Sequence, residues 1–219
     1  MNEGIRLLAQ GRYREALKEF LAAEVETEEY PELSYYLGLC YTHLGQYDEA
    51  LLYLEQVVTS DMSFLHVYQS RMILGYVYAV SARHRLAEFE FRKLLDDGYE
   101  SARVHSALAY VLYAQDKVDE AISELKEALE LDPDNPNANN SLGFILADSD
   151  REPELAVRHC TKAVAKRPDS PAYLDSLGWA LYKSGKLVEA EKALRKAASL
   201  APKEPEIVEH LKTVVVASQ

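Results

Sequence analysis

The sequence predicts an all-α protein built from stacked helix–turn–helix units, and three observations lead to this fold class. The 219-residue chain repeats itself, because Asp175–Gly185 (DSLGWALYKSG) is a near copy of Asn140–Asp150 (NSLGFILADSD). Apolar residues within each copy recur at helical spacing. Small residues occupy the same two positions of the copies. Self-similarity over a period of this length is the pattern of stacked supersecondary units.

An alanine marks each of six copies of the repeat. Successive marks are 34, 37, 34, 35 and 34 residues apart and fall at Ala16, Ala50, Ala87, Ala121, Ala156 and Ala190. A leucine followed by a second small residue precedes five of these marks, and the small residues are Gly38, Gly75, Ala109, Gly143 and Gly178. We expect both small side chains to let the two helices of a unit approach closely, since a larger one would push them apart.

The spacing places six units at about residues 1–30, 31–64, 65–101, 102–135, 136–170 and 171–204, all within one domain that spans residues 1–219. The first unit lacks the start of its first helix. Three extra residues around Leu65–Val67 predict either a longer first helix or a longer loop in the third unit. One extra residue lies near Asp150–Pro153. Residues 205–217 are expected to form a closing helix, because the last unit of a stack otherwise exposes an apolar face.

Turn residues define the helix ends. Gly11, Gly45 and Gly185 are expected in the left-handed conformation that ends a helix, which glycine adopts without penalty. Pro136 and Pro171 are expected to open helices, where a missing N–H costs little. The apolar run Val214–Val216 leaves two alternatives: part of it folds back on the sixth unit, or the native chain continues beyond it.

The segments GRYREA at Gly11–Ala16 and GQYDEA at Gly45–Ala50, with the leucine–glycine pair and the terminal proline of a unit, resemble the tetratricopeptide repeat (TPR). The repeats look most like those of bacterial members of the family. The resemblance covers essentially the whole chain. It implies a right-handed α-solenoid whose first helices line a concave groove. The chain departs from the family's aromatic fourth position, where it carries Ser34, Arg71, His105, Asn139 and Leu174.

The composition argues against several classes of function. A formal net charge of −12 disfavours binding to nucleic acid or to an anionic membrane, since both need basic surfaces. We find no catalytic or nucleotide-binding motif and no pair of histidines at helical spacing. Cys40 and Cys160 are interpreted as buried small apolar residues, and Asp148 and Asp150 as solvated turn residues. We therefore expect no enzyme activity, no cofactor and no metal.

The resemblance implies that five positions of each unit face the groove. The ninth position carries an apolar or aromatic residue throughout, namely Leu39, Tyr76, Tyr110, Phe144 and Trp179. The other predicted binding residues are Tyr35, Met72, Arg103, Tyr113, Asn137, Asn140, Tyr182 and Lys183. In the alternative interpretation the rings pack on neighbouring units, and the two asparagines only help to begin a helix. The carboxylate clamp with which family members bind acidic C-terminal peptides is missing.

These observations predict a non-catalytic scaffold or adaptor that binds a peptide or helical segment of a partner protein in an aromatic-lined groove. The alternative is a self-associating assembly factor that forms a homodimer or larger oligomer through its terminal helices. Occupation of the groove by the chain's own terminus stays open. No apolar run spans a bilayer and no signal peptide is recognisable, so we expect a cytoplasmic protein. An exported bacterial protein that has lost its signal is the alternative.

Overall fold

The computed structural model describes residues 1–60 and 62–218, and every regular element in these residues is a helix. The helices pack in sequential pairs, which confirms the predicted all-α array of repeats. The chain forms two compact parts, and we describe each by itself. The N-terminal part is residues 1–100, and the C-terminal part is residues 101–219. The boundaries of the six units, and their membership of one domain, stay predictions.

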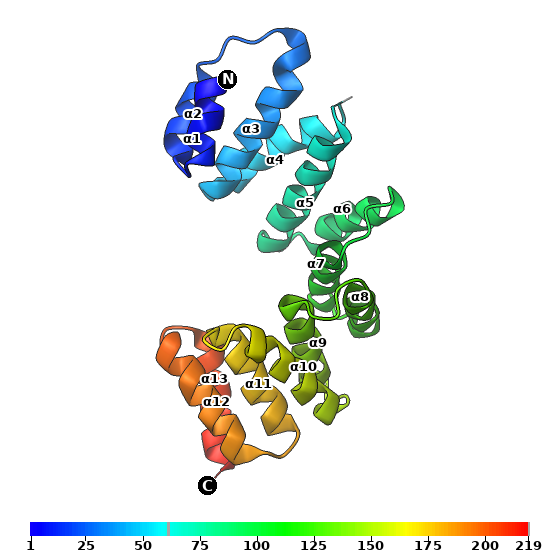
Figure 1. Ribbon diagram of the computed structural model, residues 1–219, viewed down its shortest axis with the longest axis vertical. Coiled ribbons are helices and arrows are strands. Elements are labelled where there is room, and N and C mark those ends of the chain that lie inside the picture. Colours follow the sequence, from blue (N-terminus) through cyan, green and yellow to red (C-terminus); the bar gives the residue numbers. More distant parts are fainter. Residues whose placement is uncertain (61, 219) are drawn as a thin grey trace. The chain divides into compact units, whose positions relative to one another are not determined.

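The N-terminal part contains three antiparallel helix pairs (Figure 1). Its elements are α1 (Asn2–Ala9), α2 (Tyr13–Leu21), the 3-10 helix η1 (Thr27–Glu29), α3 (Tyr30–His43), α4 (Tyr47–Val58), α5 (Phe64–Val80) and α6 (His84–Asp96). Helix α1 has 8 residues, whereas α3 and α4 have 14 and 12. Helix α5 has 17 residues, so the three extra residues lengthen this helix and not the loop before it.

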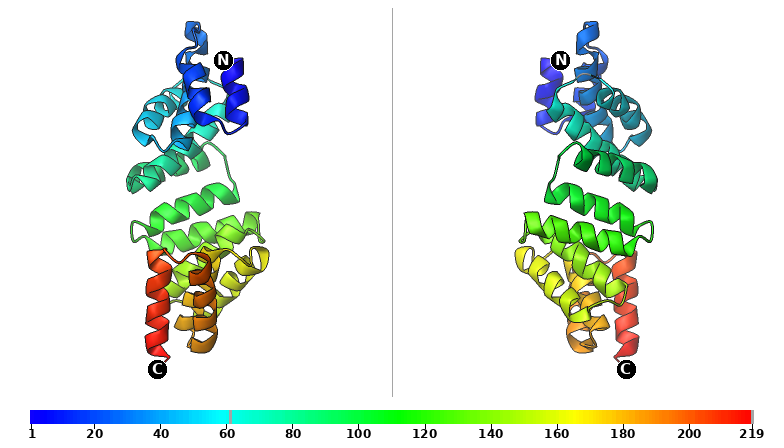
Figure 2. Two further views of the ribbon diagram at one scale, coloured as in Figure 1. Left: turned by 90° about the vertical axis from the view of Figure 1, so that its left-hand side faces the viewer. Right: turned by 90° about the vertical axis from the view of Figure 1, so that its right-hand side faces the viewer.

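The C-terminal part contains three further pairs and a closing helix. Its elements are α7 (Ala102–Tyr113), α8 (Val118–Leu131), α9 (Pro136–Asp148), α10 (Pro153–Lys166), α11 (Pro171–Lys183), α12 (Leu187–Leu200) and α13 (Pro205–Ala217). Both Pro136 and Pro171 open helices as predicted. Helix α13 packs against α11 and α12 and lies beside α12 in the left-hand view of Figure 2. Val214 is buried against Leu181 and Leu194, so the C-terminal apolar run folds back in part.

The turn inside each pair has one hydrogen-bonding pattern. Gly45 has a φ of +72°, its N–H donates to the carbonyl of Thr42, and the N–H of Gln46 donates to the carbonyl of Tyr41. This is the Schellman arrangement that satisfies the last carbonyls of a helix. Glycine takes the left-handed position in three turns, as predicted. The equivalent residues of the other three turns are also left-handed although they carry side chains, and they are Ala82, Asp116 and Asp150.

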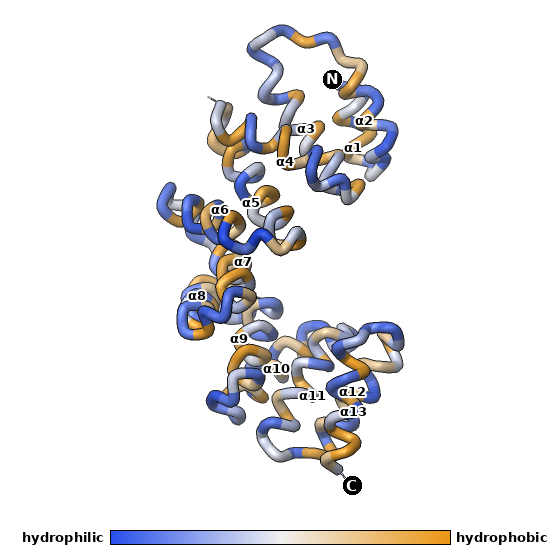
Figure 3. Tube along the Cα trace, turned by 180° about the vertical axis from the view of Figure 1, so that it is seen from behind, coloured by the Kyte–Doolittle hydropathy of each residue, from blue (hydrophilic) through white to orange (hydrophobic). Residues whose placement is uncertain are grey.

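Small residues bring the two helices of a pair together. A Cβ atom placed on Gly143 would lie 2.5 Å from Sγ of Cys160 and 2.8 Å from the carbonyl oxygen of Ala156. Cys160 therefore fills the position that large apolar side chains fill in other pairs, and it is fully buried as expected. Hydrophobic residues recur along the helices, where they can meet the partner helix (Figure 3).

Polar residues at the fourth position of a unit join its two helices. In the third unit, Nη1 of Arg71 lies 2.8 Å from Oε2 of Glu90. In the fourth, Nδ1 of His105 lies 2.7 Å from Oε2 of Glu124. Two further pairs of this kind are Ser34 with Gln56 and Asn139 with His159. Leu174, the apolar exception, is buried with Ala197 and Ile207. The polar residues that replace the family's aromatic residue thus form specific side-chain pairs with the second helix of their unit.

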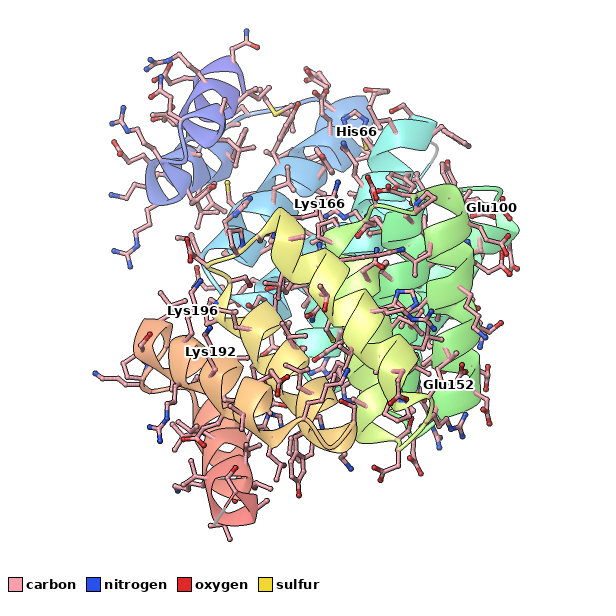
Figure 4. The ribbon with its side chains drawn as sticks, turned by 60° about the horizontal axis from the view of Figure 1, so that its bottom comes forward. His66, Glu100, Glu152, Lys166, Lys192 and Lys196 are labelled. Atoms are coloured by element: carbon pink, nitrogen blue, oxygen red, sulfur yellow. The ribbon has the colours of Figure 1, made fainter. Side chains whose placement is uncertain are left out.

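Exposed ion pairs also connect the second helix of a pair to the turn that precedes the first helix of that pair. In Figure 4, Lys166 lies at the end of α10 and Lys196 on α12. Nζ of Lys166 is 2.9 Å from the carboxylate of Asp134, and Nζ of Lys196 is 2.9 Å from that of Asp169. Exposed pairs of this kind are screened by water and dissolved salt. They add little to the stability that the buried contacts provide.

Candidate functional site

The predicted groove residues of the N-terminal part differ in exposure. Tyr35 and Met72 are buried and offer little surface to a partner, and Leu39 is half-buried. The hydroxyl of Tyr35 donates to Oε1 of Gln69. Tyr76 is 50% exposed, and a hydrogen bond with Tyr47 raises its pKa. Of these four residues, Tyr76 therefore offers the most surface to a partner.

The C-terminal part contains a cavity of about 520 Å³. Its walls come from α7, α9 and α11, each the first helix of its pair, and from the start of α13. Four predicted binding residues line it: Tyr110, Tyr113, Asn140 and Phe144. The structure thus brings together side chains that are up to 34 residues apart in the sequence.

The cavity wall is largely aromatic and aliphatic. Tyr110 is 60% exposed and presents its ring to the solvent. Tyr113 and Phe144 meet edge to face, with ring centroids 6.2 Å apart, an arrangement that aromatic pairs favour. Ile145 and Ile207 add aliphatic surface. The wall can accept an apolar side chain.

The polar groups of the wall include several hydrogen-bond acceptors. Oδ1 of Asn140 is buried and has no hydrogen-bond partner. Asp175, Glu204 and Glu206 also line the cavity. Oδ2 of Asp175 lies 3.0 Å from Nδ1 of His210. The two glutamates are exposed, and we find no ion pair for either within residues 1–60 and 62–218. The cavity therefore has an acidic rim, which we define as Glu204 and Glu206.

Asp148 connects three of the helices. It accepts one hydrogen bond from the hydroxyl of Tyr113 and one from Nε1 of Trp179, at 3.2 Å in the second case. Burial raises the pKa of Tyr113, and the hydrogen bond to Asp148 and the negative charges of Asp148 and Glu206 raise it further. The phenol stays protonated and continues to donate. Asp148 is thus a positioning residue for two predicted binding residues, although the sequence suggested only a solvated turn.

Trp179 belongs to a second cluster beside the cavity. Its ring stacks on His210 of α13 with centroids 4.2 Å apart and lies 5.2 Å from the ring of Tyr182. Nζ of Lys183 lies 5.3 Å from the centre of the Trp179 ring and 2.6 Å from the carboxylate of Asp150. Much of the Trp179 surface is therefore in contact with the chain itself, as the packing alternative describes.

The remaining predicted residues lie outside the cavity. The Oδ1 atom of Asn137 accepts a hydrogen bond from the hydroxyl of Tyr173, which joins α9 to α11. Arg103 is exposed and is absent from the cavity wall. Asn135, and not either predicted asparagine, caps α9 by accepting from the N–H of Ala138.

Sequence reasoning missed the residues that α13 contributes. Glu206 lies at the cavity, and His210 contacts Trp179 and Asp175. The available signal was the spacing: Pro205 follows Pro171 by 34 residues, so α13 stands where a seventh first helix would begin. Treating residues 205–217 only as a cap hid their contribution.

The described residues lack two other kinds of feature. Within residues 1–60 and 62–218, His, Cys, Asp and Glu side chains form no group of three that could hold a metal ion. None of the helices in the same residues combines the length and the apolar character that crossing a membrane requires.

Comparison with family models matches three segments of the chain, which together make up more than half of it. Residues 1–63 and 171–204 match models described as "Tetratricopeptide repeat", and residues 109–149 match one described as "TPR repeat". The chain belongs to the tetratricopeptide repeat family. TPR proteins mediate binding to other proteins and to peptides, and the family is generally non-catalytic.

Curated relatives include two proteins from Pseudomonas aeruginosa. The TPR repeat-containing protein PA4667 is 41% identical over 88 residues, which is 40% of this chain and 15% of that protein. The type IV pilus assembly protein PilF is 26% identical over 156 residues, 70% of this chain and 60% of PilF. The human protein O-mannosyl-transferase TMTC1 is 25% identical over 95% of this chain and 23% of its own length. The chain thus spans less than two thirds of each relative.

Several solved structures share the fold. The thermophilic TPR protein TTC0263 from Thermus thermophilus superposes with a TM-score of 0.65 at 20% identity, covering 85% of this chain and 99% of that one. YrrB, described as a TPR protein with an unusual peptide-binding site, gives 0.62 at 20% identity over 91% and 97%. The Cut9–Hcn1 assembly gives 0.79 at 13% identity over 96% and 41%. At these identities the likeness concerns the fold alone.

Proposed function

We propose that the chain is a non-catalytic scaffold that binds a peptide or helical segment of a partner protein in an aromatic-lined groove. The observation that carries this proposal is the cavity of the C-terminal part, where Tyr110, Tyr113 and Phe144 meet. An aromatic ring can bury about 150–250 Å² against a partner, and aromatic residues are frequent among those that dominate binding energy. Membership of a family that binds proteins and peptides supports the same function.

The test compares two tyrosines of similar exposure. Tyr110→Ala removes a ring from the cavity, whereas Tyr30→Ala removes a ring that is 55% exposed on α3, in the other part of the chain. Partners captured from the native host by the unmodified protein are identified and titrated against both variants. We expect Tyr110→Ala to weaken binding about tenfold, as loss of an interface anchor does, and Tyr30→Ala to leave it unchanged. Equal affinities for the two variants would reject the cavity as the binding site.

Self-association is the second candidate function, and one exposed apolar side chain favours it. Val216, in the last turn of α13, is 72% exposed although Val214 beside it is buried. A second copy could cover this end. Light scattering over a range of concentrations tests the idea: a mass that rises for the native protein and stays monomeric for Val216→Ser would support it. A constant monomer mass would remove it.

The cytoplasm is the compartment that we propose, with export as the alternative. Both cysteines are free and buried, which fits a reducing compartment. Fractionation of the native host with an antibody against the chain decides between the two.

A further inference from the structure

We propose that the cavity of the C-terminal part selects a partner segment in which an apolar side chain is flanked by lysine or arginine. This inference rests on the proposed function and names the chemistry of its ligand. It is argued from the shape of the cavity, from the hydrogen-bonding groups on its wall and from the charge at its rim.

The size and lining of the cavity suit an apolar anchor. Its volume of about 520 Å³ lies in the range of ordinary ligand pockets. Phe144, Ile145 and Ile207 give it a largely apolar wall. An apolar side chain placed there gains burial, whereas a polar side chain would lose contacts with water.

One acceptor on the wall lacks a hydrogen-bond donor. The hydroxyl of Tyr113 already donates to Asp148, and the hydroxyl of Ser176 donates to the carbonyl of Ala172 at 3.0 Å. Oδ1 of Asn140 is buried without a partner. A buried acceptor left unpaired is unfavourable, so an N–H group of the ligand that reached this oxygen, from the backbone or from a basic side chain, would satisfy it.

The acidic rim supplies the charge preference. Glu204 and Glu206 stand at the start of α13, on the edge of the cavity, and neither forms an ion pair with another described residue. The negative charge of Glu206 acts on neighbouring groups of the site, since it contributes to the raised pKa values of both Tyr113 and His210. The third acid on the wall, Asp175, is occupied by His210. Two free carboxylates beside an apolar cavity complement a cationic segment and repel an acidic one.

The test uses three short synthetic peptides with one central leucine, flanked on both sides by lysine, glutamine or glutamate. Each carries a fluorescent label and is titrated with the full chain, with anisotropy as the readout. We expect the lysine peptide to bind at least about tenfold tighter than the glutamine peptide, a ratio within the range that charge complementarity supplies. The glutamate peptide should not bind. Replacing the central leucine by serine should weaken the lysine peptide.

Two double variants separate the acidic rim from the overall negative charge of the protein. Glu204→Gln/Glu206→Gln should reduce the preference for lysine over glutamine to near unity. Glu127→Gln/Glu130→Gln makes the same change in net charge on exposed residues of α8, away from the cavity, and should keep the preference. Raising the salt concentration from about 50 mM to about 300 mM should weaken the lysine peptide selectively, because exposed charges are screened.

Several outcomes would overturn the inference. Equal binding of the three peptides would do so, as would an equal loss of preference in both double variants, or no binding of any peptide up to about 1 mM, the weak end of specific binding. A dimer whose interface covers the cavity would also reject it, because a second copy would then be the occupant. The proposed function is decided separately by the capture experiment with Tyr110→Ala, so failure of the charge preference is distinguishable from failure of the site.

Discussion

His159 and Asn139 meet between α10 and α9, with Nδ1 of His159 2.8 Å from Oδ1 of Asn139. The amide nitrogen of Asn139 donates to two backbone carbonyls near the start of α9, so its oxygen is the acceptor. Nδ1 of His159 must therefore carry a proton. Burial lowers the pKa of His159, and the positive charge of Lys162 lowers it further. The pair joins the two helices through one neutral hydrogen bond.

Breaking this pair on one side should destabilise the protein more than removing both partners. We expect Asn139→Leu to lower the free energy of unfolding by about 1–3 kcal/mol, because it leaves Nδ1 of the half-buried His159 without its partner. Adding His159→Leu should restore part of the loss. Urea denaturation of the two single variants and the double variant measures the coupling. Additive losses would show that the two side chains act independently.

The contact between Asp175 and His210 should make stability depend on pH. Burial lowers the pKa of His210, but the hydrogen bond and charge of Asp175, aided by Glu206 and Asp148, outweigh it and raise the pKa above 6.5. A raised folded pKa means that the stabilisation is fully present below the unfolded value and fades as the pH rises through the folded value. Asp175→Asn should therefore lower the melting temperature more near pH 6 than near pH 8.5.

Trp179, the only tryptophan, offers a direct readout of the same titration. Its ring stacks on His210, and a protonated imidazole quenches indole fluorescence. Emission should fall as the pH decreases through the pKa of His210 and should lose this step in His210→Leu. Glu209→Gln, on the same helix, is the control and should keep the step. An identical titration in His210→Leu would mean that another group causes it.

The left-handed residues of the turns predict opposite effects for two substitutions. Ala82 has a φ of +56°, where a side chain costs about 1–2 kcal/mol, so Ala82→Gly should raise the free energy of unfolding by up to about 1 kcal/mol. Gly45→Ala, at the equivalent position of another turn, should lower the free energy of unfolding by a similar amount. The left-handed backbone is the cause of this loss, because an added Cβ meets no atom within 4 Å. Thermal denaturation checks both signs. A change of the same sign in both variants would contradict the shared turn geometry.

Both cysteines should be inert in the folded protein. Burial raises the pKa of the Cys40 thiol to about 11 and that of the Cys160 thiol to about 12, so neither is a thiolate at neutral pH. A chromogenic disulfide reagent at pH 8 should react with neither thiol until urea unfolds the chain. Rapid reaction of one thiol under native conditions would show that its helix pair opens locally.

The repeat spacing predicts most of the helices and turns of the fold. The site depends on side-chain contacts that the spacing does not specify. Gly45 and Pro171 predict turns and helix starts because their backbone preferences are local. Ala82 was not recognised as left-handed, since packing imposes that conformation against its own preference. At the site, Tyr110 and Phe144 of the ninth position line one cavity, and their role as binding residues stays a prediction. That Asp148 would receive two donors depends on the three-dimensional approach of three helices, and a single sequence does not reveal it.

The polar pairs at the fourth position also bear on how a repetitive chain avoids errors during folding. Repeats of similar sequence can exchange partners and become trapped in mispaired forms. Here the helix with Arg71 matches the carboxylate of Glu90, whereas a swap onto the helix with His159 would bury a guanidinium beside a neutral ring. Such a mismatch is costly in a dry interior. A module transplanted between these two repeats would therefore have to carry both side chains of its pair.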